Sequence, residues 1–349
     1  MSTKNASTLP FSSLVGLQEA KLALILTIID PQIGGVLISG PKGTGKSTLV
    51  RSLSSILPSI EYIEECSFHC SPTDSRNICE ECKKKVQIEN KSLKVKEKQI
   101  EVITLPLGAT EDRVIGSLDI EKIIGSGIEA LSPGILATAN QEILYIDEIN
   151  LLPDHLVDTI LDCAASGWNI IERENISIRH PSRFILIGTM NPEEGDLRPQ
   201  LLDRLSLFAQ TGNIQNINDR VRIVELNLKQ VDWLSNSNDF IESDTELQKR
   251  IQTARTDLSS IQIGSNSKRL IATLCMALKV DGFRSDIVLA RASRAKASLE
   301  GRKIVSNDDI LECAYLTLLH RTREGGLREP PSRMEINETF SKVVESYQN

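Results

Sequence analysis

The sequence predicts an α/β domain of about 210 residues followed by an all-helical domain. In the first part of the chain, short apolar runs of strand length alternate with stretches of helical character. Two of these runs end directly at a group of glycines or of acidic residues, as strands of a parallel sheet do where ligands bind. From residue 245 onward, apolar residues recur at helical spacing, for example Leu270, Leu274 and Leu278. The predicted domains are residues 1–213, with a cysteine-containing insertion at about 64–98, and residues 214–349.

Length and charge limit the class of protein. With 349 residues the chain can bury cores for two domains. Its formal net charge of −7 gives no overall basic field, so we expect no nucleic-acid partner. The polar start Met1–Asn5 lacks the apolar core of a signal peptide, and the apolar stretch Leu22–Ile29 is too short to span a bilayer. We therefore expect a cytoplasmic protein without a membrane span, whose cysteines are free or metal-bound.

The first elements surround a glycine-rich loop. Residues 18–29 predict an amphipathic helix, residues 35–39 a buried strand, and residues 47–53 the start of a helix. Between the last two, the sequence matches G-x-x-x-x-G-K-[ST], in which backbone N–H groups curl around phosphate at a helix N-terminus. In this pattern Lys46 reaches the β- and γ-phosphates of a nucleotide, and Ser47 holds Mg²⁺. The residues expected to bind nucleotide are Gly40, Pro41, Lys42, Gly43, Thr44, Gly45, Lys46, Ser47 and Thr48.

Four cysteines follow the loop and its helix. Cys66, Cys70, Cys79 and Cys82 lie within 17 residues, with spacings that suit tetrahedral Zn²⁺ or an iron–sulfur cluster. The alternatives are four free cysteines in an insertion, or redox control by pairing of the thiols. The lysine-rich residues 83–98 predict a solvated helix or loop, because a run of one charge cannot bury a face.

The next strands end in polar residues. Residues 100–107 predict a strand, and residues 142–146 predict another that ends at Asp147 and Glu148. In phosphate-loop enzymes the first such acid orders Mg²⁺ and the second polarises the attacking water, so we assign Asp147 to the metal and Glu148 to the base. The alternative is a core strand followed by a charged turn.

A further strand is predicted at residues 183–189, and it leads to Asn191 and Pro192. An Asn just past the carboxyl end of a strand can contact a phosphate or the attacking water, although an Asn-Pro turn explains the dipeptide equally well. Beyond it, residues 214–231 predict a helix with charge on one face, and residues 235–245 predict a polar linker or loop.

With these pieces placed, the chain resembles the AAA+ ATPase subunit I of magnesium chelatase over nearly its whole length. That complex inserts Mg²⁺ into protoporphyrin IX. The phosphate loop alone is generic, but the ordered set of motifs is specific. The segments that carry the resemblance are Leu105–Asp119, Leu131–Ala137, Asn150–Asp158, Ala164–Asn169, Glu172–Glu174 and Asn191–Arg204.

The resemblance implies further roles. Asn191 matches the position called sensor 1, and Arg204 matches the arginine finger, which in a ring reaches the nucleotide of the neighbouring subunit. Arg284 matches the lid arginine called sensor 2, with Arg291 as a close competitor. The alternative for each arginine is a surface salt bridge. The implied cofactors are ATP and Mg²⁺, and the implied partners are copies of the chain in a hexameric ring, a D-type subunit and a large porphyrin-binding subunit.

The resemblance also implies two insertions, and this chain differs from the family pattern at two places. Residues near 119–140 would form a helix insert, and residues 169–182 would form a hairpin facing the ring pore and the partner subunits. The family commonly has a His-Arg-Gly-like stretch where this chain has Asn140-Gln141-Glu142, and a Phe where it has Leu205. Neither change touches the expected phosphate chemistry, so we interpret both as drift.

Two other functions stay open on sequence alone. The same motor could serve cobalt insertion into a corrin ring, because the large subunit selects the metal and the macrocycle. A chaperone-like AAA+ of the related MoxR type could remodel a protein partner instead. The stretches Ala164–Trp168 and Leu197–Arg204 favour the chelatase branch over the chaperone.

Overall fold

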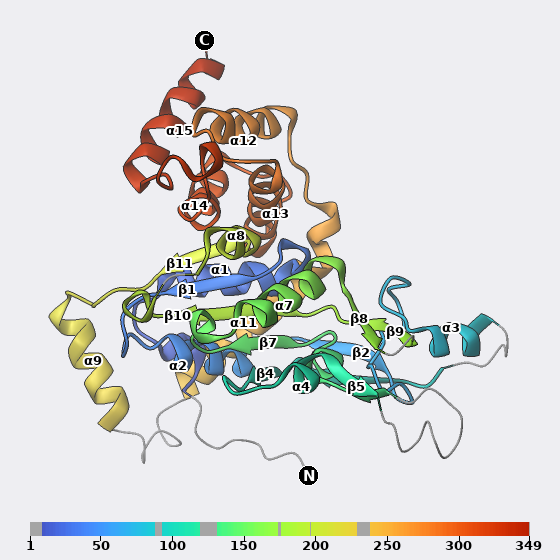
Figure 1. Cartoon of the computed structure of the whole chain (residues 1–349). Helices are drawn as coiled ribbons and strands as arrows, with labels where there is room; N and C mark the ends of the chain where they lie inside the picture. The colour runs from blue at the N-terminus through green and yellow to red at the C-terminus, as the bar shows by residue number, and fades with distance from the viewer. Residues whose placement is uncertain are drawn as a thin grey trace. The chain divides into compact units, whose positions relative to one another are not determined.

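The computed structural model of the chain describes residues 9–87, 93–118, 131–173, 176–195, 197–228 and 238–348 (Figure 1). The chain divides into two compact units. The first unit comprises Met1–Ile56 and Thr189–Asn349, and the second comprises Leu57–Gly188. This division by compactness is a different one from the domain boundary near residue 213, which stays a prediction.

A parallel sheet lies at the centre of the α/β fold. Its five strands have the order β11-β1-β10-β7-β4, and the pairs β1/β11, β10/β7 and β4/β7 are parallel. Every residue of β1, β7 and β10 is buried, as expected for strands covered on both faces. The α/β prediction and the four predicted strands are confirmed, and β11 is an additional edge strand. The bounds are β1 Val36–Ser39, β4 Val102–Leu105, β7 Ile143–Ile146, β10 Ile185–Met190 and β11 Leu207–Gln210.

The remaining elements of the first unit are helices. The predicted C-terminal helical region is confirmed: α12 to α15, drawn in orange to red in Figure 1, pack on one another. Leu270, Leu274 and Leu278 lie in its core, each at most 4% exposed. The helices are α1 Gln18–Ile29, α2 Lys46–Ser52, α8 Pro199–Arg204, α9 Ile217–Leu228, α11 Asn238–Asp257, α12 Ser265–Ala277, α13 Arg284–Leu299, α14 Asn307–Leu318 and α15 Arg333–Gln348.

Two expectations for these helices were wrong in part. Helix α1 has the predicted bounds but is not amphipathic, because residues 23–29 are all buried. It contacts α11, α13, β1 and β11, so apolar residues are needed on every side. The predicted linker at 235–245 is helical from residue 238 on, where α11 begins. Its buried Asp244 accepts hydrogen bonds from the backbone N–H groups of Phe11 and Ser12, both at 2.8 Å, and this tertiary role outweighs the polar local sequence.

The second unit adds short antiparallel pairs to β4 and β7. Strand β2 pairs with β3, β5 with β6, and β8 with β9. The β8–β9 pair confirms the predicted hairpin. The bounds are β2 Ser59–Ile63, α3 Glu80–Gln87, β3 Val95–Gln99, α4 Glu111–Ile115, β5 Gly116–Leu118, β6 Leu131–Pro133, α6 Ile135–Thr138, α7 Asp154–Ser166, β8 Trp168–Arg173 and β9 Ile176–Pro181.

The lysine-rich residues 83–98 only partly match their prediction. Their first part continues helix α3, but residues 95–98 belong to strand β3, so the expectation of helix or loop is wrong there. The strand is almost wholly exposed, and pairing with β2 satisfies its backbone without an apolar face. Residues 119–130 of the predicted helix insert lie outside the described residues, and the rest of that range holds β6 and α6.

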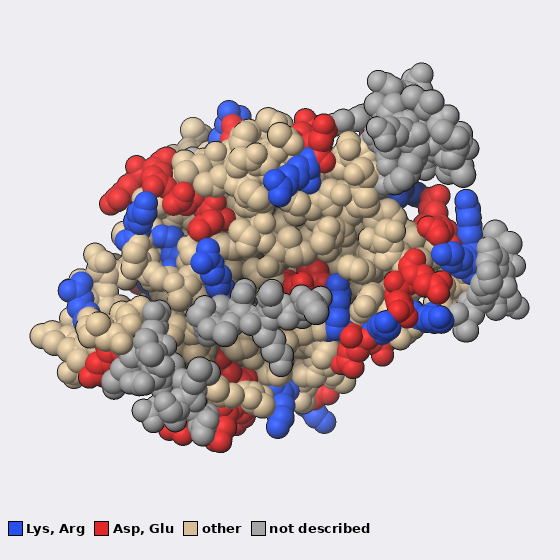
Figure 2. All heavy atoms as spheres, turned by 90° about the horizontal axis from the view of Figure 1, so that it is seen from below, with Lys and Arg blue, Asp and Glu red and all other residues tan. Residues whose placement is uncertain are grey.

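Among the described residues, no helix combines the length and the apolar character needed to cross a membrane. Basic and acidic side chains are interspersed on the face that Figure 2 displays. The expectation of no nucleic-acid partner stays a prediction.

Candidate functional site

The glycine-rich loop joins buried strand β1 to helix α2, as its sequence predicts. Gly43 and Gly45 have φ of 81° and 84°, a left-handed conformation that glycine adopts without steric cost. No atom lies within 4 Å of the position that a side chain at Gly43 would occupy, so its backbone is open to a ligand. Ser47 and Thr48 lie in the first turn of α2. The loop therefore has the conformation and the access that phosphate binding requires.

A close approach of Thr211, just after β11, requires glycine at position 40. A methyl group at Gly40 would collide with the hydroxyl and the carbonyl oxygen of Thr211. Thr211 also contacts the loop directly, since its hydroxyl lies 3.0 Å from that of Thr44 and 3.2 Å from the carbonyl oxygen of Ser39. The loop is thus held against the edge of the sheet.

Lys46 is the buried cation of this loop, with 8% of its side chain exposed. Its ammonium donates to the carbonyl oxygens of Gly40 at 2.6 Å and of Pro41 at 2.8 Å. The charge therefore lies inside the ring of backbone that the loop forms. A phosphate on the loop would meet both this ammonium and the surrounding N–H groups.

A cavity of about 480 Å³ opens beside the loop, within the first unit. Gly43 and Thr44 form its wall on the loop side, and residues of the segment after β11 and of α9 form much of the rest. The lining is mixed: apolar side chains of Leu17, Ile214, Ile223 and Val224 alternate with polar groups, so it offers both a packing surface and hydrogen-bonding groups to a ligand. Besides the loop, the lining residues include Leu17, Gln18, Asn213, Ile214, Arg220, Ile223 and Val224.

The two predicted acids follow β7 in the second unit. Asp147 comes directly after the strand, and Glu148 after it has φ of 54°. A left-handed conformation is uncommon for Glu and is found where a side chain must point in a particular direction. Glu148 precedes the short 3₁₀ helix Ile149–Leu151. The turn is local to the second unit and does not by itself distinguish a catalytic pair from a charged turn.

Asn191 follows β10 and caps the 3₁₀ helix Pro192–Glu194. Its side-chain oxygen accepts a hydrogen bond from the N–H of Glu193 at 3.3 Å, and the residue is 5% exposed. This cap confirms the turn that the Asn-Pro dipeptide predicts. The sensor-1 role of Asn191 stays a prediction.

Arg204 is the last residue of α8, and its side chain is exposed. The backbone on both sides of Arg204 is held by two buried residues that the sequence analysis did not identify. Arg321 donates to the carbonyl oxygen of Asp203, to Oδ1 of Asp203 at 3.0 Å and to the carbonyl oxygen of Ser206 at 3.1 Å. Such bonds fix the end of α8, and with it the direction in which Arg204 leaves the helix.

His320 completes this support. It is 2% exposed, and its Nε2 lies 2.8 Å from the carbonyl oxygen of Leu205, so Nε2 carries the proton. Burial, and next the charge of Arg321, lower the pKa of His320 to about 3. His320 is therefore neutral near pH 7. The available sequence signal was a His-Arg pair directly after the apolar end of a predicted helical segment.

The two candidate sensor arginines differ in their partners. Arg291 forms an ion pair with Asp30 at 3.2 Å, and Asp30 is 5% exposed. Arg284, exposed at the start of α13, donates to the carbonyl oxygen of Asp203 at 3.3 Å. Arg291 thus has a structural contact, whereas Arg284 lies beside the end of α8.

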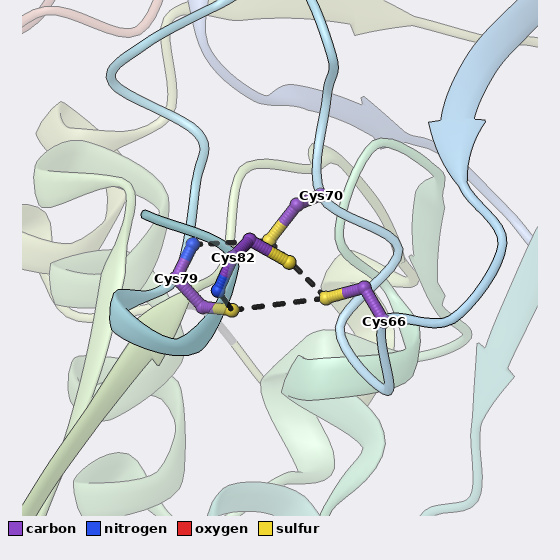
Figure 3. A group of neighbouring side chains, drawn as sticks. All are labelled: Cys66, Cys70, Cys79 and Cys82. Atoms are coloured by element: carbon purple, nitrogen blue, oxygen red, sulfur yellow. Dashed lines mark hydrogen bonds between the residues drawn. The ribbon is translucent and has the colours of Figure 1, made fainter. Parts of the chain in front are cut away.

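The four cysteines of the insertion come together in the second unit. We call Cys66, Cys70, Cys79 and Cys82 the cysteine cluster; their sulfur atoms all lie within 4.8 Å of one another, and Figure 3 shows the side chains converging. The other three cysteines are buried elsewhere. Burial raises the pKa of Cys163 to about 12, which suits a packing role.

Residues 140–142, interpreted as drift, contact this insertion. Asn140 donates to the carbonyl oxygen of Phe68 at 2.8 Å, and Gln141 donates to that of His69 at 2.6 Å. Glu142 is 2% exposed and forms an ion pair with Lys98, while burial raises its pKa. The departure at 140–142 therefore has a structural reason: Asn140 and Gln141 anchor the loop that carries the first two cysteines, and Glu142 pairs with the strand that follows the insertion's helix.

Comparison with known proteins bears on the whole chain. A family model described as "Magnesium chelatase, subunit ChlI" matches residues 114–199, and a model described as "AAA lid domain" matches residues 268–344. The chain is 48% identical over 338 residues to magnesium-chelatase subunit ChlI-2, chloroplastic, of Arabidopsis thaliana, covering 96% of this chain and 80% of that protein.

A second relative comes from an archaeon. The chain is 48% identical over 327 residues to the magnesium-chelatase subunit ChlI homolog of Methanocaldococcus jannaschii, covering 92% of this chain and 87% of that protein. Among solved structures, a chain from the complex between the BchI and BchD subunits of magnesium chelatase is 41% identical. Its TM-score is 0.53, and the match covers 96% of this chain and 99% of that chain.

Proposed function

Because the chain belongs to the magnesium-chelatase subunit ChlI family of AAA+ ATPases, we propose that it is the motor subunit that drives Mg²⁺ insertion into protoporphyrin IX on a separate large subunit. The observation that carries the proposal is the loop Gly40–Ser47, curled around the buried ammonium of Lys46 and open to a cavity of about 480 Å³. The loop suits a triphosphate, and the volume of the cavity beside it lies in the range of ligand-binding pockets.

Each predicted site residue has a role in this proposal. Lys46 and the N–H groups of the loop bind the phosphate oxygens, and Asn191 orients the attacking water. Glu148 accepts a proton from that water. Ser47 and Asp147 would hold the Mg²⁺ that accompanies ATP, and their hydroxyl and carboxylate oxygens are ligands that this ion prefers. The bound ion supplies positive charge against the charge that develops on the phosphoryl oxygens.

The arginines extend the site to a second copy of the chain. We propose that Arg204 acts as the arginine finger on the nucleotide of the neighbouring subunit in a hexameric ring. Its exposure at the end of α8 supports this role. Arg284 is the better candidate for sensor 2, because Arg291 is engaged with buried Asp30. The domain division near residue 213, with a C-terminal lid, belongs to the same proposal.

The partners in this proposal are a D-type subunit and a large porphyrin-binding subunit. The solved BchI–BchD complex supports the first of them, because a chain of that complex is similar to this chain over nearly its full length. The cofactors are ATP and Mg²⁺, and we place the activity in the cytoplasm. Zinc is proposed in addition, at the separate site formed by the cysteine cluster.

A Glu148→Gln variant tests the proposal. Without the carboxylate as base, hydrolysis should fall about 10²- to 10⁴-fold while ATP still binds, measured by phosphate release and by equilibrium binding of a fluorescent nucleotide. Glu338→Gln, on the exposed face of α15, is the matched control and should hydrolyse ATP normally. Hydrolysis that survives in Glu148→Gln would remove the assigned base.

The chelatase assignment needs its own readout. Mixed with the large and D-type subunits, ATP and Mg²⁺, the chain should support formation of fluorescent magnesium protoporphyrin, and Glu148→Gln should not. Metal insertion only with cobalt and a corrin ring, or none with either macrocycle, would contradict the proposed substrate.

A further inference from the structure

The cysteine cluster gathers four sulfur atoms in the interior of the insertion. The thiols come from the loop after β2 and from the start of α3, and each residue is at most 7% exposed. In Figure 3 the four side chains point toward a common centre. We propose that Cys66, Cys70, Cys79 and Cys82 bind one Zn²⁺ ion, and that this ion holds the insertion against the β8–β9 hairpin. The proposal is independent of the ATPase assignment.

Distances between the sulfur atoms favour a single ion. The sulfur of Cys66 lies 3.4 Å from that of Cys70 and 3.8 Å from that of Cys79. A tetrahedral ZnS₄ site with Zn–S bonds of about 2.3 Å has sulfur atoms about 3.8 Å apart. In an iron–sulfur cluster the four thiolates are divided among two or four irons, and those on different irons are held apart by the bridging sulfides. Of the two metal sites that the spacing allows, the geometry therefore selects zinc.

Backbone N–H groups point at these sulfur atoms. Those of Phe68 and Cys79 donate to the sulfur atoms of Cys66 and Cys70, at 3.4 and 3.1 Å. The N–H of Cys82 donates to the sulfur of Cys79 at 3.4 Å. Such bonds stabilise a thiolate, the form that binds a metal, and they orient each ligand as second-shell contacts do at known metal sites.

Nearby charge and helix position are also favourable. Cys79 and Cys82 flank the first residues of α3, where the helix dipole favours a negative group. Four thiolates on Zn²⁺ carry a net charge of roughly −2, and Lys83 and Lys84 follow directly in the sequence, whereas Lys85 pairs with Glu81. His69 is not one of the residues whose ligand atoms converge, and its Nδ1 accepts a hydrogen bond from Lys98 at 3.1 Å.

A small apolar core surrounds the cysteines. Besides the four thiols, it holds buried Ile63 and three partly buried residues, Phe68, Ile78 and Leu93. Ordering a loop costs conformational entropy, and burial of a few apolar side chains offsets only part of that cost. Binding of a structural zinc ion contributes folding free energy, so a bound ion would add to the order that this core and the anchors at Asn140 and Gln141 provide.

Two contacts connect the insertion to the hairpin. The ring of Phe68 stacks on His180 of β9, with centroids 4.7 Å apart and planes 5° from parallel. Glu80, next to Cys79, pairs with Arg179 of β9 at 2.8 Å. Both contacts come from residues beside metal ligands. A bound zinc ion would therefore set the position from which the insertion holds β9.

Zinc content tests the site. Protein purified under reducing conditions without chelator should contain about one zinc per chain by mass spectrometry of the metal. The double variant Cys70→Ser/Cys82→Ser should contain less than about a tenth of that, because two of the four ligands are lost. Cys163→Ser, a buried cysteine of the same unit, is the matched control and should keep its zinc.

A second measurement keeps the test independent of whether that variant folds. A mercurial reagent added to wild-type protein should release about one zinc per chain, detected with a metallochromic dye, as the four thiols react. Absence of zinc, zinc retained by the double variant, iron with visible absorbance, or disulfides among these cysteines would each overturn the proposal.

The link to the hairpin has its own variant. Phe68→Ala keeps all four ligands, so its zinc content should be normal. The amide hydrogens of β8 and β9 should nevertheless exchange about tenfold faster or more, since the stacking partner of His180 is lost. Unchanged exchange in Phe68→Ala and in zinc-depleted wild type would show that the ion does not hold the hairpin.

Discussion

The phosphate-binding loop and the cysteine cluster both bring several polar groups to one point, but by different means. The loop uses eight consecutive residues between a fully buried strand and a helix, and Lys46 bonds to carbonyls of its own loop. The cysteine cluster uses four residues spread over 17 positions, and its first loop is anchored by Asn140 and Gln141, some seventy residues away.

The two regions differ in what determines their geometry. The geometry of a contiguous motif is determined by its own residues, because the glycine conformations and the start of the helix are set locally. A distributed site depends on tertiary contacts, so its parts can be altered without touching a ligand. The two regions should therefore respond differently to substitution. Substitutions in the loop should change the rate of ATP hydrolysis, whereas substitutions around the cysteine cluster should change its local order and its zinc content.

The largest effect is expected for Lys46→Ala. Removing the ammonium that faces the phosphates should lower the rate of ATP hydrolysis by about 10²- to 10³-fold or more, the loss typical for one electrostatic donor. Phosphate release at saturating ATP measures it. Zinc content should be unchanged, since Lys46 bonds to the carbonyl oxygens of Gly40 and Pro41 in its own loop and none of the four cysteines belongs to that loop.

Arg51→Ala is the matched control, because it removes a cation from the exposed face of the same helix. It should hydrolyse ATP at the wild-type rate. A Lys46→Ala variant that lost zinc along with activity would contradict the separation of the two regions.

The same contrast explains what the sequence could predict. The α/β class, the strands before Gly40 and Asp147 and the conformation of the loop followed from local patterns, because a buried strand and a glycine turn depend on neighbouring residues. The anchoring role of Asn140 could not be predicted, because its partner, the carbonyl oxygen of Phe68, lies 72 positions away and no local pattern indicates the contact. The support of α8 by Arg321 was missed for the same reason: it joins positions 118 residues apart.

Asn140→Ala tests the distributed site at a smaller expected effect. The buried amide bridges the carbonyl oxygen of Phe68 and the N–H of Arg183, at 2.8 and 2.9 Å. Without it, the loop between Cys66 and Cys70 loses an anchor, and zinc affinity should fall about 10- to 100-fold, as for other outer contacts of metal ligands. Competition with a chelator of known affinity measures it.

Asn227→Ala is the control for this change. Its amide donates to the carbonyl oxygen of Ile223 in its own exposed helix, at 2.8 Å, and the helix lies outside the second unit, so zinc affinity should stay the same. Equal affinity in Asn140→Ala and wild type would mean that the cysteine cluster is as self-contained as the phosphate loop.

The smallest effect concerns pH and the buried support of α8, a third region that is also distributed along the chain. The folded-state pKa of His320 is about 3, below the unfolded value of about 6.5, so the unfolded chain binds more protons between these values. The contribution of His320 to the free energy of unfolding should therefore be nearly constant above pH 6.5 and fall below it, by about 1.4 kcal/mol at pH 5.5. Burial and the charge of Arg321 lower the pKa, and Nδ1 of His320 has no partner among the described residues, so an added proton would be buried without an acceptor. Urea unfolding of the first unit at pH 7.5 and 5.5 measures the difference.

His320→Gln keeps an amide that can donate to the carbonyl oxygen of Leu205, and it should abolish this loss of stability. His155→Gln, at an exposed position, should retain the loss. If His320→Gln loses as much stability as wild type on acidification, the acid sensitivity lies elsewhere.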